Sequence, residues 1–176
     1  MLEIPVPDPS LVVLIGAAGS GKSSFAACHF DPDEVLSSDG FRALISGDPA
    51  NQAVTRAAFG RLHRELARRL AERRLTVVDA TNVDRGARRD LLRRATIAGL
   101  PSVAIVFDLA AELVLARNAA RISRVVDEGV VRRHLALLRE ELDGSNGNSG
   151  LQGFAGVTIL RDPMAVASAR VIRQAS

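Results

Sequence analysis

The chain has 176 residues, of which 47% are hydrophobic and 3% aromatic, a composition that excludes a disordered chain and predicts one globular domain with an aliphatic core. Its single cysteine, Cys28, excludes an intrachain disulfide and a multi-cysteine metal site. A formal net charge of +3 suits an anionic partner such as a nucleotide or a nucleic acid, although a genome-wide preference for arginine codons explains the charge equally well.

The sequence gives no indication of export or membrane insertion. Residues 1–10 lack the basic start and the apolar stretch of a signal peptide. No apolar run reaches the ~18 residues of a membrane span, and a lone cysteine fits a reducing compartment. We therefore expect a cytoplasmic protein without a membrane partner.

Short β-branched runs alternate with longer stretches of helical periodicity along the chain. Strands are predicted at Leu11–Ile15, Glu34–Ser37, Thr76–Asp79, Val103–Phe107 and Val157–Leu160. Helices are predicted at Lys22–Phe30, Phe41–Ser46, Gln52–Arg74 and Asp84–Ala98, from about Ala110, and at Glu128–Leu142. This alternation predicts an α/β fold, in which a parallel sheet has helices on both faces and a ligand cleft at the carboxyl ends of its strands.

No internal repeat or linker divides the chain, so we expect a single domain over residues 1–176. Its core is expected over residues 11–161, with a flexible tail at residues 1–10 and a carboxyl-terminal tail, residues 162–176, that could close the chain as a helix. The polar, glycine-rich segment Asp143–Gly150 predicts a mobile loop before the last strand.

The first predicted strand runs directly into a glycine-rich segment that matches the phosphate-binding pattern G-x-x-x-x-G-K-[ST]. The matching residues, with the serine that follows them, are Gly16, Ala17, Ala18, Gly19, Ser20, Gly21, Lys22, Ser23 and Ser24. Glycine lets such a loop turn its N–H groups toward phosphate oxygens, and the helix behind it adds a positive end. Lys22, the only lysine of the chain, would contact the β- and γ-phosphates of a nucleotide, and Ser23 would bind Mg2+. A fortuitous glycine turn is the alternative, which the flanking strand and helix disfavour.

Asp79 ends the predicted strand of the segment TVVDATN. An acidic residue at this position can hold a water molecule on Mg2+. The alternative is a helix cap, but Asn82 and Asp84 are better placed to cap the helix that follows. We favour a role for Asp79 at the metal or in the active-site network.

The segment SSDGFR places Asp39 just after a predicted strand, with Arg42 three residues later. Asp39 could accept the proton of an acceptor hydroxyl, and Arg42 could hold a phosphate of the acceptor or orient Asp39. A helix-capping Asp with an i,i+3 salt bridge has the same spacing. The pattern alone supports both interpretations equally.

A second basic motif, RNAARISR, contains Arg117, Arg121 and Arg124. Their i, i+4, i+7 spacing predicts one helical face that carries three guanidinium groups, with no acidic residue inside the segment to neutralise them. Such a face is typical of a lid that closes over a triphosphate, where the arginines stabilise charge on the transferring phosphate. A solvated charged helix is the alternative.

The remaining chemistry-bearing residues show no pattern of a site. His29, His63 and His134 lack the spacing of metal ligands, so each is expected at the surface or in a satisfied structural position. Cys28, one turn into the first helix, is expected in the core.

These motifs, together with the long arginine-rich helix and the segment NQAVTRAAF, occur in the order seen in polynucleotide 5′-kinases. Over about residues 11–161 the chain resembles the kinase module of bacterial polynucleotide kinase-phosphatases, which repair nucleic acids. The resemblance implies a P-loop kinase fold with an arginine-bearing helical lid. It also implies transfer of the γ-phosphate of ATP, GTP or another NTP to the 5′-OH end of DNA or RNA, with phosphatase or ligase modules in a longer parent or in a partner protein.

The resemblance carries roles over to individual residues. Lys22 and Ser23 would bind the donor phosphates and Mg2+. Asp39 would be the general base on the 5′-hydroxyl, and Arg42 would contact the acceptor 3′-phosphate. In the lid, Arg121 and Arg124 would contact the donor phosphates beside Arg117.

Two other functions remain open at this point. One is a P-loop kinase for a small-molecule hydroxyl, such as that of a sugar acid, an antibiotic or a nucleotide-sugar. The other is a nucleotide-dependent switch or a non-catalytic binding module. Nothing in the sequence distinguishes DNA from RNA as acceptor.

Overall fold

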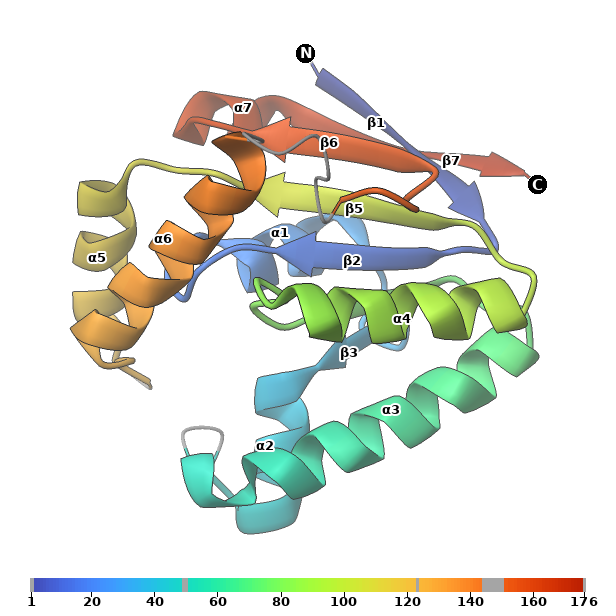
Figure 1. Cartoon of the computed structure of the whole chain (residues 1–176), viewed down its shortest axis with the longest axis horizontal. Coiled ribbons are helices and arrows are strands. Elements are labelled where there is room, and N and C mark those ends of the chain that lie inside the picture. Colours follow the sequence, from blue (N-terminus) through green and yellow to red (C-terminus); the bar gives the residue numbers. More distant parts are fainter. Residues whose placement is uncertain (1, 49–50, 123, 144–150, 176) are drawn as a thin grey trace.

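The computed structural model describes residues 2–48, 51–122, 124–143 and 151–175. Its central sheet has five parallel strands in the order β3-β4-β2-β5-β6 (Figure 1). The strands are β2 Leu11–Ile15, β3 Val35–Ser37, β4 Thr76–Asp79, β5 Ser102–Phe107 and β6 Gly156–Leu160. Each begins within one residue of its predicted start, so the α/β fold with a parallel sheet is confirmed.

Helices connect these strands and cover both faces of the sheet (Figure 1). They are α1 Lys22–His29, α2 Ser38–Ser46, α3 Thr55–Ala71, α4 Arg85–Ile97, α5 Ala111–Ala119, α6 Glu128–Asp143 and α7 Pro163–Ser168, with a short 3-10 turn, η1, at Gln52–Val54. Within the described residues, none of the helices combines the length and the hydropathy that a membrane crossing needs.

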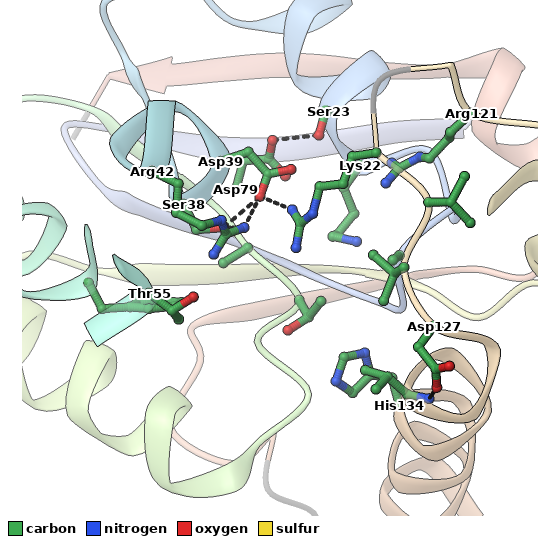
Figure 2. A pocket seen from close by; sticks show the side chains of 18 residues that line it. Lys22, Ser23, Ser38, Asp39, Arg42, Thr55, Asp79, Arg121, Asp127 and His134 are labelled. Atoms are coloured by element: carbon green, nitrogen blue, oxygen red, sulfur yellow. Dashed lines mark hydrogen bonds and ion pairs between the residues drawn. The ribbon is translucent and has the colours of Figure 1, made fainter. Parts of the chain in front are cut away.

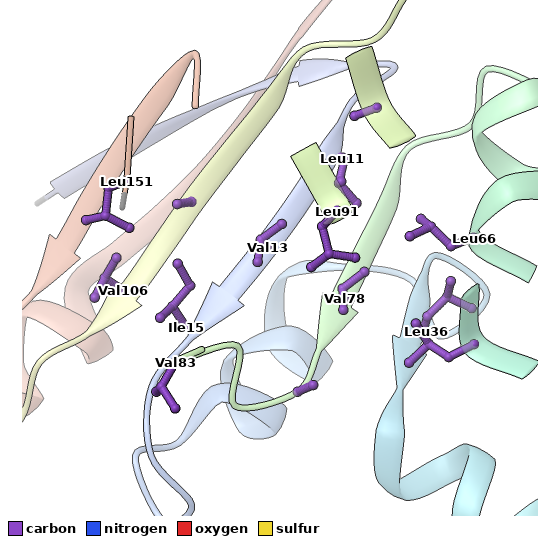
Figure 3. Packing of buried hydrophobic residues seen from close by; sticks show 14 of the residues in the cluster. Leu11, Val13, Ile15, Leu36, Leu66, Val78, Val83, Leu91, Val106 and Leu151 are labelled. Atoms are coloured by element: carbon purple, nitrogen blue, oxygen red, sulfur yellow. The ribbon is translucent and has the colours of Figure 1, made fainter. Parts of the chain in front are cut away.

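Successive residues of β2 point to opposite faces of the sheet, as strand geometry requires. Leu11, Val13 and Ile15 face a core built with α3, α4 and α6 (Figure 3). Val12 and Leu14 face a second core, which α1 and a small additional sheet cover. The strand is therefore buried on both sides, as a short continuous apolar run indicates.

Helix α2 begins earlier than predicted. Ser37 ends β3 and caps the helix, because its Oγ accepts a hydrogen bond from the N–H of Gly40 (3.4 Å). Asp39 therefore lies in the first turn of α2, where a carboxylate interacts favourably with the helix dipole. The short strand and this cap together place Asp39 at the carboxyl edge of the sheet.

The two segments predicted as tails are structured in the described residues. β1 Leu2–Asp8 and β7 Ala169–Ala175 form a two-stranded parallel sheet, and α7 precedes β7. Ile4 and Val6 alternate inward along β1 and are buried against the α1 side of the core. Three prolines in the first ten residues conceal this alternation, since proline in a short run argues against a strand. Of the glycine-rich loop predicted at 143–150, Asp143 ends α6 and the rest lies outside the described residues.

Candidate active site

A cavity of about 490 Å3 opens at the carboxyl ends of β2, β3 and β4, the edge where parallel sheets bind ligands. Lys22 after β2, Asp39 after β3 and Asp79 at the end of β4 line this cavity (Figure 2). Helix α6 and the loop between α5 and α6 also line it. The sequence-predicted residues of three separate motifs thus come together in one place.

The glycine-rich loop adopts backbone conformations that require its glycines. Gly19 and Gly21 have φ values of +88° and +94°, which residues with side chains rarely adopt. Gly19 has a second constraint, because a Cβ atom there would lie 2.5 Å from the backbone oxygen of Val114 in α5. The loop therefore packs directly against α5, and α1 begins immediately behind it.

Lys22 folds back over this loop. Its Nζ donates hydrogen bonds to the carbonyl oxygen of Ala17 (2.8 Å) and to Ser20 Oγ (3.3 Å). Burial lowers the pKa of the Lys22 ammonium group to about 8, while the carboxylates of Asp79 and Asp39 act in the opposite direction. The side chain is thus still mostly protonated at neutral pH, and an anionic ligand would stabilise that form.

Ser23 and Asp79 form a direct link between α1 and the end of β4. Ser23 Oγ donates a 2.7 Å hydrogen bond to Asp79 Oδ2. Burial raises the pKa of the Asp79 carboxyl group, and the hydrogen bond from Ser23 and the charge of Lys22 oppose this rise. A hydroxyl and a carboxylate oxygen are the hard ligands that Mg2+ prefers. No group of three His, Cys, Asp or Glu side chains in the described ranges could hold a metal, so this pair would need phosphate oxygens or water to complete a site.

Asp39 lies between two arginines that come from different segments. Its Oδ1 pairs with Arg42 on the next turn of α2 (Figure 2). It also pairs with Arg124 from the loop before α6. Ser38 Oγ also donates to the same oxygen, at 3.4 Å. Arg42 is buried, with 3% of its surface exposed. The i,i+3 salt bridge considered from the sequence is therefore present, but the cap of the helix is Ser37 and not Asp39.

A second cavity, of about 570 Å3, lies on the other side of the glycine-rich loop. Gly19, Gly21 and Ser24 line it together with one side of α1 and with α7. Sequence reasoning missed the lining residues that come from these helices: Phe25, Cys28, His29, Pro163, Val166 and Ala167. Cys28 is exposed here, so its expected place in the core is wrong. The sequence did contain an indication of this wall. Gly21, Phe25 and Cys28 have i, i+4, i+7 spacing, which places Phe25 and Cys28 on the side of α1 that lies next to Gly21.

The prediction that three arginines share one helical face is wrong. Helix α5 ends before Arg121, so Arg117 lies in its last turn whereas Arg121 and Arg124 follow in a loop. Asn118 explains the break, because its buried side chain donates to the carbonyl oxygen of Val126 (2.7 Å) and accepts from the N–H of Val126 (3.1 Å). These two hydrogen bonds hold the segment at Val126 beside α5.

The three arginines nevertheless reach the two cavities. Arg117 lines the second cavity, Arg124 the first, and Arg121 lines both. Arg121 therefore borders both spaces, beside the glycine-rich loop. A ligand that occupied both cavities would lie along the loop and under this arginine.

The first cavity also has walls that sequence reasoning did not identify. Thr55 and Phe59 contribute from the start of α3, and Val125, Val126, Val130 and His134 contribute from the loop and from α6. Phe59 and the three valines give these walls a largely apolar character. Periodicity marks such residues as partly buried, but it does not tell a core position from a cavity wall.

The family model of an AAA domain, AAA_33, matches residues 11–143 of the chain. No curated protein matches the chain in sequence. A chain of the Pnkp1/Rnl/Hen1 RNA repair complex is 22% identical, with a TM-score of 0.67, and the match covers 80% of this chain and 47% of that one. This chain therefore corresponds to about half of the length of that relative.

Two small-molecule kinases are also similar in structure. A sugar kinase from Janibacter sp. HTCC2649 is 19% identical over 86% of this chain and 84% of its own, with a TM-score of 0.55. A gluconokinase from Sinorhizobium meliloti 1021 is 19% identical over 92% and 87%, with a TM-score of 0.52. At these identities the likeness establishes a common P-loop kinase fold, which kinases with different acceptors share.

Proposed function

Because the chain belongs to the AAA_33 family of AAA domains and has the fold of P-loop kinases, we propose that it transfers the γ-phosphate of ATP, or of another NTP, to the 5′-hydroxyl end of DNA or RNA. The observation that carries this proposal is the position of Asp39. Its carboxylate shares one cavity with the phosphate-loop lysine and is backed by Arg42 and Arg124.

On the donor side, residues 16–24 would surround the phosphates of the nucleotide with backbone N–H groups. Lys22 would exchange its bonds to Ala17 and Ser20 for the β- and γ-phosphates. The second cavity, beside Arg117 and α7, would take the nucleoside of the donor. Ser23 and Asp79 would hold Mg2+, which when bound supplies positive charge to the β- and γ-phosphates.

In the transfer step, the acceptor oxygen forms a bond to the γ-phosphorus as the bond from that phosphorus to the bridging oxygen of the nucleoside diphosphate breaks. The proton of the acceptor hydroxyl passes to the carboxylate of Asp39. Arg121 and Arg124 would stabilise the negative charge that spreads over the transferring group. Arg42, buried behind Asp39, would orient that carboxylate and contact the acceptor 3′-phosphate.

The apolar walls of the first cavity favour a nucleic acid over a polyhydroxy acceptor. Phe59, Val125 and Val130 present hydrocarbon surface to the cavity. The flat faces of a nucleobase pack well against such surface, whereas the hydroxyl groups of a sugar acid would lose their hydrogen bonds to water without replacement. Val125 is also 60% exposed and Val130 42% exposed, so apolar surface extends from the cavity to solvent.

An acceptor panel tests the proposal. The protein is incubated with γ-labelled ATP and Mg2+ and with 5′-OH DNA, 5′-OH RNA or gluconate. We expect label on at least one oligonucleotide, and we expect Asp39→Asn to reduce the rate by about 100-fold or more, a typical loss for a positioned base. Asp31→Asn changes an exposed aspartate outside the cavity and serves as the matched control. Transfer to gluconate alone would instead support the small-molecule kinase.

A further inference from the structure

His134 lies on α6 and lines the first cavity, where Figure 2 draws it well apart from Thr55 on the α3 side. Its Nδ1 is shielded from solvent and has no hydrogen-bond partner among the described residues. The sequence predicts a surface position or a satisfied structural position for this histidine, whereas the structure leaves its side chain partly exposed and its Nδ1 unsatisfied. A shielded polar atom without a partner costs free energy unless a ligand or an ordered water molecule satisfies it.

The fold fixes the side of α6 that carries His134. Val131, Leu138 and Glu141 are buried, and with His134 they follow the i, i+3, i+7, i+10 spacing of one helical side. Glu141 accepts a 2.8 Å hydrogen bond from Arg88 and a 3.0 Å bond from Arg85. The position of His134 over the cavity is therefore held by packing and by an ion pair about two turns away.

The buried ion pair also links α6 to the loop after β4. Arg88 is fully buried and donates to the carbonyl oxygens of Asn82 (2.9 Å) and Val83 (2.8 Å). The same loop begins with Ala80 and Thr81, which line the cavity together with Asp79 at the end of β4. His134 is thus held in a fixed relation to the residues at the end of β4.

The electrostatic setting keeps the imidazole neutral at pH 7. Burial lowers the pKa of His134, and the positive charges of Lys22 and Arg133 lower it further. A neutral imidazole has one donor and one acceptor nitrogen. Lys22, Arg121 and Arg124 already supply cations to this cavity for phosphate groups. A neutral imidazole is instead suited to bind an uncharged polar atom of the ligand, away from its phosphate groups.

We propose that His134 is a binding residue of the acceptor subsite, whose Nδ1 hydrogen-bonds an uncharged polar atom of the nucleoside that carries the 5′-hydroxyl. The contact would fix that nucleoside between the apolar walls at Phe59 and Val130, with its hydroxyl against Asp39. This inference rests on the proposed function and adds a residue that recognises the acceptor rather than the donor.

The test separates the acceptor KM from the ATP KM in steady-state transfer to a 5′-OH oligonucleotide. His134→Ala is expected to raise the acceptor KM about 10-fold, the effect of one lost hydrogen bond to a shielded partner, and to leave the ATP KM within about twofold. His134→Asn places an amide where Nδ1 lies and is expected to recover most of the loss. Arg132→Ala, at an exposed position of the same helix and outside both cavities, is the matched control and is expected to leave both constants unchanged.

Several outcomes would overturn the inference. An unchanged acceptor KM in His134→Ala would do so, as would an equal rise in both KM values or a loss that His134→Asn does not relieve. Thermal melting of each variant identifies a merely structural role, because a misfolded site lowers the melting temperature and affects ATP as well. If wild-type protein transfers no phosphate to an oligonucleotide, the proposed function fails before any variant is measured, and this inference fails with it.

Discussion

The guanidinium group of Arg124, from the loop before α6, pairs with the carboxylate of Asp39, which lies 85 residues earlier in the first turn of α2. The pair joins the segment that would close over the donor to the helix that would receive the acceptor. In the proposed reaction, the Arg124 guanidinium group would also stabilise negative charge on the transferring phosphate. Arg124 therefore provides a direct check of the transfer geometry.

Replacing Arg124 by alanine is expected to lower kcat by about 10²- to 10³-fold, because preorganised charge at a transferring group contributes on that scale. Steady-state transfer kinetics measure the effect. Arg132→Ala removes an exposed arginine of α6 that pairs with Glu128, and it should leave kcat unchanged. Equal rates for wild type and Arg124→Ala would contradict a role of this loop in catalysis.

The loss of activity at high pH should reflect the deprotonation of Lys22. Burial depresses the pKa of this ammonium group to about 8, so the charged form dominates below that pH and is lost above it. The value of kcat/KM for ATP, which reflects the free enzyme, is expected to fall as pH rises through about 8. A flat profile from pH 7 to 9.5 would contradict the assignment.

The variant Lys22→Arg tests whether the loop requires the shape of the lysine ammonium group as well as its charge. The Lys22 ammonium fits inside the loop through bonds to Ala17 and Ser20, and the larger planar guanidinium group lacks space for the same contacts. We expect a loss of about 100-fold or more in kcat/KM for ATP. Isothermal titration with ATP should show the same loss in binding.

Two glycines with similar backbone conformations predict different outcomes when changed to alanine. Gly19 has φ +88° and a Cβ there would meet the Val114 backbone oxygen at 2.5 Å, whereas Gly47 has φ +74° and no heavy atom within 4 Å of the added carbon. Gly47→Ala should cost about 1–2 kcal/mol in the free energy of unfolding, the strain of a left-handed residue. Gly19→Ala should cost more and should also weaken ATP binding, because α5 and the loop must separate. Urea unfolding and ATP titration measure both effects, and equal behaviour of the two variants would contradict the contact.

Glu141→Ala tests the buried ion pair that positions α6. The change leaves Arg88 buried and without its carboxylate, which should lower the free energy of unfolding by about 3–5 kcal/mol. The double variant Arg88→Met with Glu141→Leu removes both charges and is expected to be more stable than the single variant. Urea unfolding distinguishes them, and a double variant that is less stable than Glu141→Ala would indicate that the arginine contributes chiefly through its bonds to the backbone.

Much of the fold could be predicted from local sequence because each strand of the central sheet is a short apolar run between turn signals. The motif of the glycine-rich loop also helped to predict the elements beside it, since this motif requires a strand before it and a helix after it. The edge of the sheet at which Lys22, Asp39 and Asp79 meet followed from parallel topology alone.

The remaining features depend on contacts between distant segments. β1 pairs with β7 in a register that joins Leu2 to Ala169, and neither segment has a pattern that reveals the other. The spacing of Arg117, Arg121 and Arg124 fits a helix, but the bonds of Asn118 to Val126 turn the chain before Arg121. Periodicity could not show this break, because an asparagine that bonds a later backbone group leaves no local signal.

The central claim is that the chain phosphorylates 5′-hydroxyl ends, and one matched comparison tests it most directly. Wild-type protein is incubated with γ-labelled ATP, Mg2+ and two oligonucleotides of one sequence, one with a 5′-hydroxyl and one with a 5′-phosphate. The account predicts label on the 5′-hydroxyl strand, released as a labelled 5′-mononucleotide on nuclease digestion, and none on the 5′-phosphate strand. Equal labelling of both strands, or labelling of neither in DNA and in RNA, would contradict it.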